Sequence, residues 1–402
     1  MSTANCKQVR IHAVGDISPG DCIAPGFGVL SIAEKYSCHF LFESIRPALD
    51  GSDLLLGNLE GSLSHLCTKK NLRMCGLPGM ASALKKAGFD VLSVANNHVL
   101  DHGPDVFKET VIHCQDAGLM VCGLRGTAEY YSQPVIIEKN EMKVGILAYN
   151  WVGSEYLDVM DQYIAQIHDG VVNYSWIRDS DRDAMARNTI ETKNVHVIND
   201  IRELRSHVDI VVIMPHWGYE WILHPPLGVI LEARSFIDAG ADLILGSHPH
   251  VHQGVEIYKN KIIAYSLGNF LFDGLSEGYD SGMLIKCLVS RYGDVSEYEL
   301  SILDKAGFFQ PCLASAKDAA WHNELVLESS MTITDPDAIH LLNDDLIYRE
   351  QEKVYKKLKY RKILFLLRTA TRHPSIMGVI GLKIINLLKV IAQRVRGRKV
   401  RW

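Results

Sequence analysis

The 402-residue sequence lacks the motifs of several common protein classes. It contains no Gly-x-x-x-x-Gly-Lys phosphate loop and no Gly-x-Gly-x-x-Gly dinucleotide fingerprint, which argues against P-loop and dinucleotide-binding proteins. Internal repeats and low-complexity tracts are also absent. What remains is a composition of 47% hydrophobic and 22% charged residues, which is that of an ordinary globular protein with a sizeable core.

Cysteine pairs with the spacing of a metal site are missing as well. The nine cysteines are odd in number and form no Cys-x-x-Cys motif, and we interpret them as free thiols in a reducing compartment. The segment from Met1 to Arg10 lacks the apolar stretch of a signal peptide. Both observations predict a cytoplasmic location.

Acidic residues are almost absent from the C-terminal segment. Residues Gln351 to Trp402 contain 15 Lys and Arg but only one acid, Glu352, whereas the formal net charge of the whole chain is -5. We therefore predict an acidic domain over residues 1–345, with a motif-bearing core at 9–290, followed by a basic helical tail at 346–402. The charged and aromatic segment 151–193 is interpreted as an insertion near the mouth of a site.

The tail has two interpretations. A helical projection of Ile376 to Ala392 separates an apolar half from a half that carries Lys383 and Lys389. Such a helix could lie on the anionic inner face of a membrane as a peripheral contact, or it could dock on the domain or on a second subunit. Two lysines within the run argue against a spanning helix.

Seven short runs rich in apolar and β-branched residues predict buried strands. They are residues 10–15, 53–57, 90–95, 143–149, 209–214, 241–245 and 261–266. Stretches with helical periodicity lie between several of them, at 78–87, 105–117, 198–206 and 228–239, and three of these helices end before a glycine. The alternation predicts a layered α/β fold whose polar ligand groups gather at the carboxyl ends of strands.

Polar clusters follow these apolar runs repeatedly. They contain Asp16, Asn58 with Glu60, Asn96 to His98 with Asp101, His216 with Glu220, His248 and His250 with Gln253, and Asn269. Carboxylates, an amide carbonyl and imidazoles make a mixed ligand set that suits Mn, Fe or Zn. A pair of such ions could clamp a tetrahedral anion and activate water, as phosphoester hydrolysis requires.

Each cluster alone also has a structural interpretation. Asp16 could cap a turn, Glu60 could be a solvated loop acid, and His98 could be a hydrogen-bonded structural histidine. His216 follows a strongly apolar run, so its imidazole must find a partner or a metal. The coincidence of six clusters in strand-end register favours a metal centre, with His98 placed to protonate a leaving oxygen. Nucleic acid is not expected as a partner, since Trp217 and Trp221 are better explained as packing around the site.

Six motifs in one order carry a resemblance to a known family. They are GD at 15–16, NLE at 58–60, ANNHVLDHG at 95–103, HWGYE at 216–220, GSHPHVHQ at 246–253 and YSLGNF at 265–270. Over about residues 9 to 290 the sequence resembles the CapA family of poly-γ-glutamate capsule synthesis proteins, which is similar to calcineurin-like metallophosphoesterases. The resemblance implies a four-layer α/β/β/α sandwich with a two-metal site.

Carried over by position, the resemblance implies metal ligands and a catalytic histidine. The ligands would be Asp16, Glu60, Asn97, His216, His248 and His250, and His98 would be the catalytic histidine. Two positions depart from the phosphoesterase pattern: Ser18 stands where a histidine is usual, and Glu60 stands where a bridging Asp is usual, so one metal is expected to be weakly held. The family often has an N-terminal membrane anchor, and from the apolar-poor segment Met1 to Arg10 we expect none here.

The leading hypothesis is a metal-dependent hydrolase of phosphoester type that acts on an anionic polymer or phosphoester in capsule or cell-envelope metabolism. Glu220 and Asp101 would orient histidines, and substrate would meet Asn58, Asn96, Gln253 and Asn269. Two alternatives stay open: a non-catalytic accessory subunit of a polyglutamate synthase or export complex, and an amide hydrolase that cleaves γ-glutamyl bonds.

Overall fold

The computed structural model describes residues 7–22, 26–66, 74–153, 160, 162–167, 194–273, 281–306, 309–343 and 346–354. The predicted amphipathic helix of the tail and most of the predicted insertion at 151–193 lie outside these residues. Among the helices that are described, none is both long and apolar enough to cross a membrane.

The first sheet has eight strands and is built around the N-terminal strand β1. Its order is β16-β15-β14-β1-β2-β5-β6, and β13 also pairs with β1. The strands are β1 (Gln8–Ile17), β2 (Leu54–Leu59), β5 (Val91–Ser93), β6 (Met120–Cys122), β13 (Asn269–Leu271), β14 (Gly282–Ser290), β15 (Val295–Ala306) and β16 (Gln310–Leu313). β1, β2, β5 and β6 run parallel, so their carboxyl ends lie at one edge. A short separate pair, β3 (Ser62–Leu63) and β4 (Cys75–Gly76), lies beyond β2.

The second sheet has six strands in the order β11-β12-β10-β9-β8-β7. The strands are β7 (Val135–Lys139), β8 (Met142–Asn150), β9 (Ile210–His216), β10 (Leu243–Leu245), β11 (Val255–Tyr258) and β12 (Lys261–Ala264). The four central strands are parallel, while β7 and β11 close the edges as antiparallel partners of β8 and β12.

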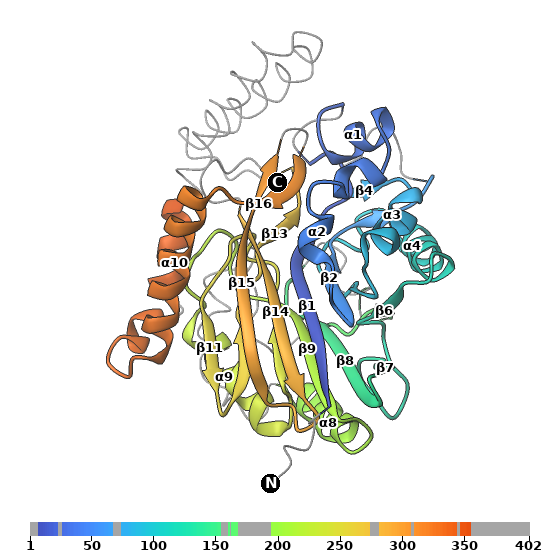
Figure 1. The fold of residues 1–402 in the computed structure, drawn as a ribbon. Coiled ribbons are helices and arrows are strands. Elements are labelled where there is room, and N and C mark those ends of the chain that lie inside the picture. Colours follow the sequence, from blue (N-terminus) through green and yellow to red (C-terminus); the bar gives the residue numbers. More distant parts are fainter. Residues whose placement is uncertain are drawn as a thin grey trace, which may run out of the picture.

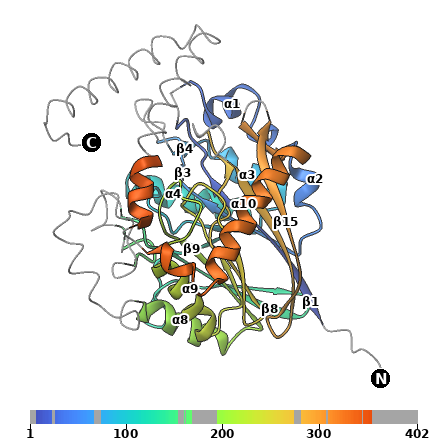
Figure 2. The same ribbon diagram turned by 90° about the vertical axis from the view of Figure 1, so that its left-hand side faces the viewer.

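Helices cover the outer face of each sheet. The helices are α1 (Val29–Lys35), η1 (His39–Phe42), α2 (Arg46–Leu49), α3 (Gly79–Ala87), α4 (Pro104–Asp116), α8 (Val195–Arg205), α9 (Leu227–Ala239), α10 (Ala316–Thr334) and η3 (Ile339–Leu342). The first five pack on the first sheet, and α8 and α9 pack on the second (Figure 1). α10 runs beside β11 and β15, along the side of the sandwich (Figure 2).

Three hydrophobic cores separate the layers, one between each adjacent pair. Leu54 and Leu56 of β2 face the core between the two sheets, whereas Leu55 faces the core under the first helices. In β8, Ile146 faces the space between the sheets and Leu147 faces α8 and α9. Successive side chains of a strand point to opposite faces, so strands covered on both sides need continuous apolar runs. The predicted four-layer α/β/β/α sandwich is thereby confirmed.

One cysteine contradicts the prediction that all are free thiols. Cys75 is disulfide-bonded, whereas Cys38, Cys114, Cys122 and Cys287 are buried free thiols. Sequence spacing could not reveal this bond, because pairing depends on which thiols the fold brings together. The cysteines therefore no longer support a reducing, cytoplasmic location.

Candidate metal centre

Side chains from both sheets meet where the parallel strands end. The first sheet contributes Asp16, near the end of β1, and Glu60, which directly follows β2. The second sheet contributes His216, the last residue of β9, and the loop after β10 carries His248 and His250. Asp16 Oδ2 lies 3.5 Å from His250 Nδ1, so these distant stretches of the sequence form one cluster.

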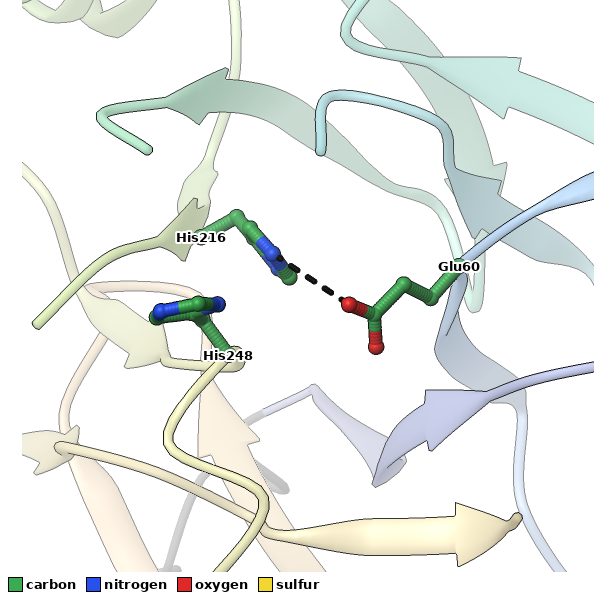
Figure 3. A group of neighbouring side chains, drawn as sticks. All are labelled: Glu60, His216 and His248. Carbon is green, nitrogen blue, oxygen red and sulfur yellow. Dashed lines mark ion pairs between the residues drawn. The ribbon is translucent and has the colours of Figure 1, made fainter. Parts of the chain in front are cut away.

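The Glu60 carboxylate lies among three imidazoles. Its Oε1 atom is 3.7 Å from His216 Nε2, 3.8 Å from His250 Nε2 and 3.9 Å from His98 Nε2. Figure 3 shows the His216 ring pointing toward this carboxylate, with His248 beside it. These separations exceed hydrogen-bond length, but they are shorter than twice a typical metal–ligand bond of about 2.1 Å. One cation could therefore reach both atoms of each pair.

Glu60 is fully buried and lacks the hydrogen bonds that a buried carboxylate requires. Neither of its oxygens makes a hydrogen bond within the described part of the chain. An uncompensated buried charge costs several kcal/mol, on the order of the penalties measured for broken buried ion pairs. Burial raises the pKa of Glu60 to about 8. A bound cation would remove this penalty and restore the charged form.

Burial and the neighbouring carboxylates decide which histidines are neutral and which is protonated. Burial lowers the pKa of His216 well below its ordinary value and that of His248 to about 4, which leaves both as neutral imidazoles, the form that binds metals. Burial also lowers the pKa of His250, but Glu60 and Asp16 together raise it to a net value of about 10. A metal ion would replace that proton as the counter-charge of the two carboxylates.

Three groups of buried or half-buried side chains could hold a divalent ion. They are Glu60 with His216 and His248, Asp16 with Glu60 and His250, and Glu220 with His248 and His250. Glu60 belongs to the first two groups, which is the position of a bridging ligand. Asn97 joins the first, because its Oδ1 lies 2.9 Å from His216 Nε2. Two ligands at right angles on one ion would be about 3 Å apart, so the donor set fits a divalent metal.

The loop that carries the histidine pair has an unusual backbone. His248 and His250 have φ angles of 95° and 57°, in the left-handed region that side chains rarely adopt. The backbone of Trp221 is also in the left-handed region, with a φ angle of 66°. Its N–H donates to the Pro249 carbonyl over 2.7 Å. Such conformations cost about 1–3 kcal/mol each and cluster at functional sites.

Asn58, Asn96 and Asn269, predicted to meet substrate, hold the ligands in place. Asn58 donates to Asp16 Oδ1 over 2.8 Å, and Asn269 Oδ1 lies 3.0 Å from His250 Nδ1. Asn96 is fully buried; its amide donates to Asn58 Oδ1 and to the Leu59 carbonyl, and its oxygen accepts from the His98 N–H. These bonds give Asn58 and Asn96 positioning roles.

Gln253, also predicted to meet substrate, bonds away from the cluster. Its amide donates to the Ile222 carbonyl over 2.8 Å, which ties together the loops after β9 and β10. The sequence interpretation missed Ser247, whose hydroxyl lies 3.0 Å from His216 Nδ1 and leaves Nε2 to face Glu60. Its position directly before His248 was the available signal, because ligating histidines usually have such a partner on the second nitrogen.

His98 is the most accessible imidazole beside Glu60. Its side chain is 17% exposed, against 1% for His216 and 5% for His250. Asp101 Oδ2 lies 2.8 Å from His98 Nδ1 and fixes the ring so that Nε2 points toward Glu60. This arrangement suits an acid that donates a proton from Nε2 to a substrate.

Gly15 allows the close approach that places Asp16. A Cβ atom on Gly15 would lie 1.8 Å from the backbone oxygen of Gly268, and that carbonyl also accepts the Asp16 N–H. We expect Gly15→Ala to lower the free energy of unfolding by about 1–3 kcal/mol, as overpacking does. Gly153→Ala is the matched control, because no atom of the described residues lies within 4 Å of its Cβ position. Equal urea-unfolding curves for the two variants would contradict this expectation.

The fold and the cluster together define a class. Two packed sheets with helices on both outer faces, and a carboxylate–histidine cluster at the strand ends, define a layered α/β protein with a candidate metal centre. A family model described as "Bacterial capsule synthesis protein PGA_cap" matches residues 10–274. The chain belongs to this family of bacterial capsule synthesis proteins.

Individual proteins with capsule or polymer synthesis names are also similar to this chain. The chain is 30% identical over 285 residues to the capsule biosynthesis protein CapA of Bacillus anthracis, covering 69% of this chain and 63% of that protein. It is 25% identical over 232 residues to a "Probable polyglutamine synthesis accessory protein" of Mycobacterium tuberculosis, covering 55% and 56%. The matches therefore span less than two thirds of the length of these relatives.

A solved 5'-nucleotidase precursor from Thermus thermophilus is also similar. It is 12% identical with a TM-score of 0.38, covering 81% of this chain and 59% of the other.

Proposed function

We propose that this protein is a metal-dependent hydrolase of phosphoester type that acts on an anionic ester or polymer during capsule or polyglutamate formation. The observation that carries the proposal is the buried Glu60 carboxylate, which lies 3.7 to 3.9 Å from three imidazoles and has no hydrogen bond among the described residues. A bound cation would supply the partner that this buried carboxylate lacks and would stabilise its charged form.

Two divalent ions, Mn, Fe or Zn, would share Glu60. One would be held by Glu60, Asn97, His216 and His248, and the other by Asp16, Glu60 and His250. When bound, such ions neutralise the charge of an anionic ester and lower the pKa of water to near neutrality. The protein's own contribution is to hold these ligands at fixed positions through Asn58, Ser247 and Asn269.

His98 would supply the proton. Its Nδ1–H is held by Asp101, so the ring presents Nε2 on the side of Glu60. When His98 is protonated, its Nε2–H donates to the leaving oxygen of the ester. The Asp101 carboxylate stabilises the positive charge of the imidazolium before the proton is transferred. The His98 side chain is partly exposed, so a substrate oxygen could reach it.

Removal of metal should abolish activity and lower the free energy of unfolding. We expect the purified protein to contain divalent metal, to lose turnover of an aryl phosphate after chelation, and to recover it with added Mn²⁺. Mn²⁺ at about 100 times its Kd should stabilise the fold by about 2.7 kcal/mol, measured as a higher unfolding midpoint. Mg²⁺ at the same concentration controls for ionic strength. A protein that neither contains nor binds metal would refute the proposal.

A second candidate is a non-catalytic accessory role in polymer synthesis. The name of the Mycobacterium tuberculosis relative, a polyglutamine synthesis accessory protein, favours it. This role predicts stoichiometric metal with no turnover of any phosphoester and no change on His98→Ala. Release of glutamate from polyglutamate by the same preparation would indicate instead an amide hydrolase.

A further inference from the structure

Helix α10 lies outside the segment that the family model matches, yet it contacts both loops that carry the second sheet's ligands. The match ends at residue 274, and α10 spans Ala316–Thr334. We propose that α10 is a positioning element of the metal centre, with Ser329 fixing the loops after β9 and β10 relative to each other. This inference rests on the metal site of the proposed function.

Ser329 connects the two loops through one hydroxyl. Its Oγ donates to the Leu223 carbonyl over 3.0 Å and accepts the Gly254 N–H over 3.1 Å, and the residue is 1% exposed. Leu223 lies three residues after Glu220, and Gly254 lies four residues after His250. The hydroxyl therefore fixes the distance between the loops that bring Glu220 to His248 and His250.

Gly254 shows that α10 must approach this closely. A Cβ on Gly254 would lie 2.7 Å from the Ser330 backbone nitrogen and 2.9 Å from the Ser329 carbonyl carbon, atoms that cannot move without shifting the helix. Ser330 adds a second bond, because its Oγ accepts the Val255 N–H over 2.8 Å. At the other end of α10, His322 Nδ1 lies 2.7 Å from His252 Nε2.

The loops require such support because of their backbone. His248, His250 and Trp221 all have positive φ angles, and strained residues keep these conformations only where the surroundings hold them. Within the described residues, bonds between the loops come from Trp217, Trp221 and Gln253. α10 adds contacts from outside both loops, at three positions along its length.

The test measures Mn²⁺ binding to the full chain by electron paramagnetic resonance, well below the unfolding temperature. We expect Ser329→Ala to weaken Mn²⁺ binding by about tenfold, as loss of an outer support does, and to change the spectrum of the bound ion. Thr334→Ala is the matched control, because Thr334 is exposed and, among the described residues, its hydroxyl bonds only within α10, to the Ser330 and Met331 carbonyls.

A helix that merely supports the fold gives a different result. Ser329→Ala would then lower the unfolding midpoint but keep the wild-type Mn²⁺ affinity and spectrum, and the inference would be overturned. If Ser329→Ala does not fold, His322→Ala carries the same test from the other end of α10. Wild-type protein that binds no Mn²⁺ refutes the proposed function itself, whereas unchanged binding in the variants refutes only the role of α10.

Discussion

Glu60→Gln should remove the metal from an otherwise folded protein. Gln has nearly the volume of Glu but carries no charge, so the buried site keeps its packing and loses its central ligand. We expect metal affinity to fall by more than about 100-fold, beyond the effect of losing an outer partner, and aryl phosphate turnover to fall to background. Elemental analysis of the purified variant measures the first effect directly.

The control for this variant is Glu138→Gln on β7. Glu138 is exposed, so the same substitution there should leave metal content and turnover unchanged. The Glu60 variant should also lose the Mn²⁺-induced rise in unfolding midpoint. Wild-type metal content in Glu60→Gln would mean that the cluster binds no ion through this carboxylate.

His98→Ala should separate catalysis from metal binding. Removal of a positioned general acid costs about 10²–10⁴-fold in turnover, whereas the ligand groups that contain Glu60 do not require His98. We therefore expect full metal content with turnover reduced by that factor. Asp101→Asn should give a smaller loss, because His98 stays in place but its Nδ1–H loses a charged acceptor.

The matched control is His39→Ala, which removes an imidazole from an exposed position. Its metal content and turnover should equal those of the wild type. The informative comparison is between a substrate with a good leaving group and one with a poor one. An acid matters most when the leaving oxygen is basic, so His98→Ala should lose more turnover on an alkyl phosphate than on a nitrophenyl phosphate. Equal losses on both would assign His98 to a role other than proton donation.

The strands that build the site could be predicted because burial on both faces leaves a simple pattern. The apolar residues of β2 run up to Asn58 and those of β9 run up to His216, and Glu60 directly follows β2. Parallel strands place those ends at one edge, so the convergence of Asp16 and Glu60 with the histidines followed from order along the chain.

The partners that hold the ligands could not be predicted in the same way. Asn96 and Gln253 stand inside recognisable motifs, but their amides bond to backbone carbonyls of other segments, and sequence does not show which way an amide points. β14 becomes the neighbour of β1 although it follows all the motifs. α10 has a Ser/Thr-rich last turn (Ser329 to Thr334) with little helical periodicity, so neither its existence nor its contact with Gly254 was apparent.

The most direct test of the metal centre is anomalous diffraction from crystals of the protein grown with Mn²⁺. The account predicts an anomalous peak at bonding distance, about 2.0–2.3 Å, from the Glu60 carboxylate and from His216 or His250. Glu60 bonded only to water or protein, with no such peak at saturating Mn²⁺, would contradict it.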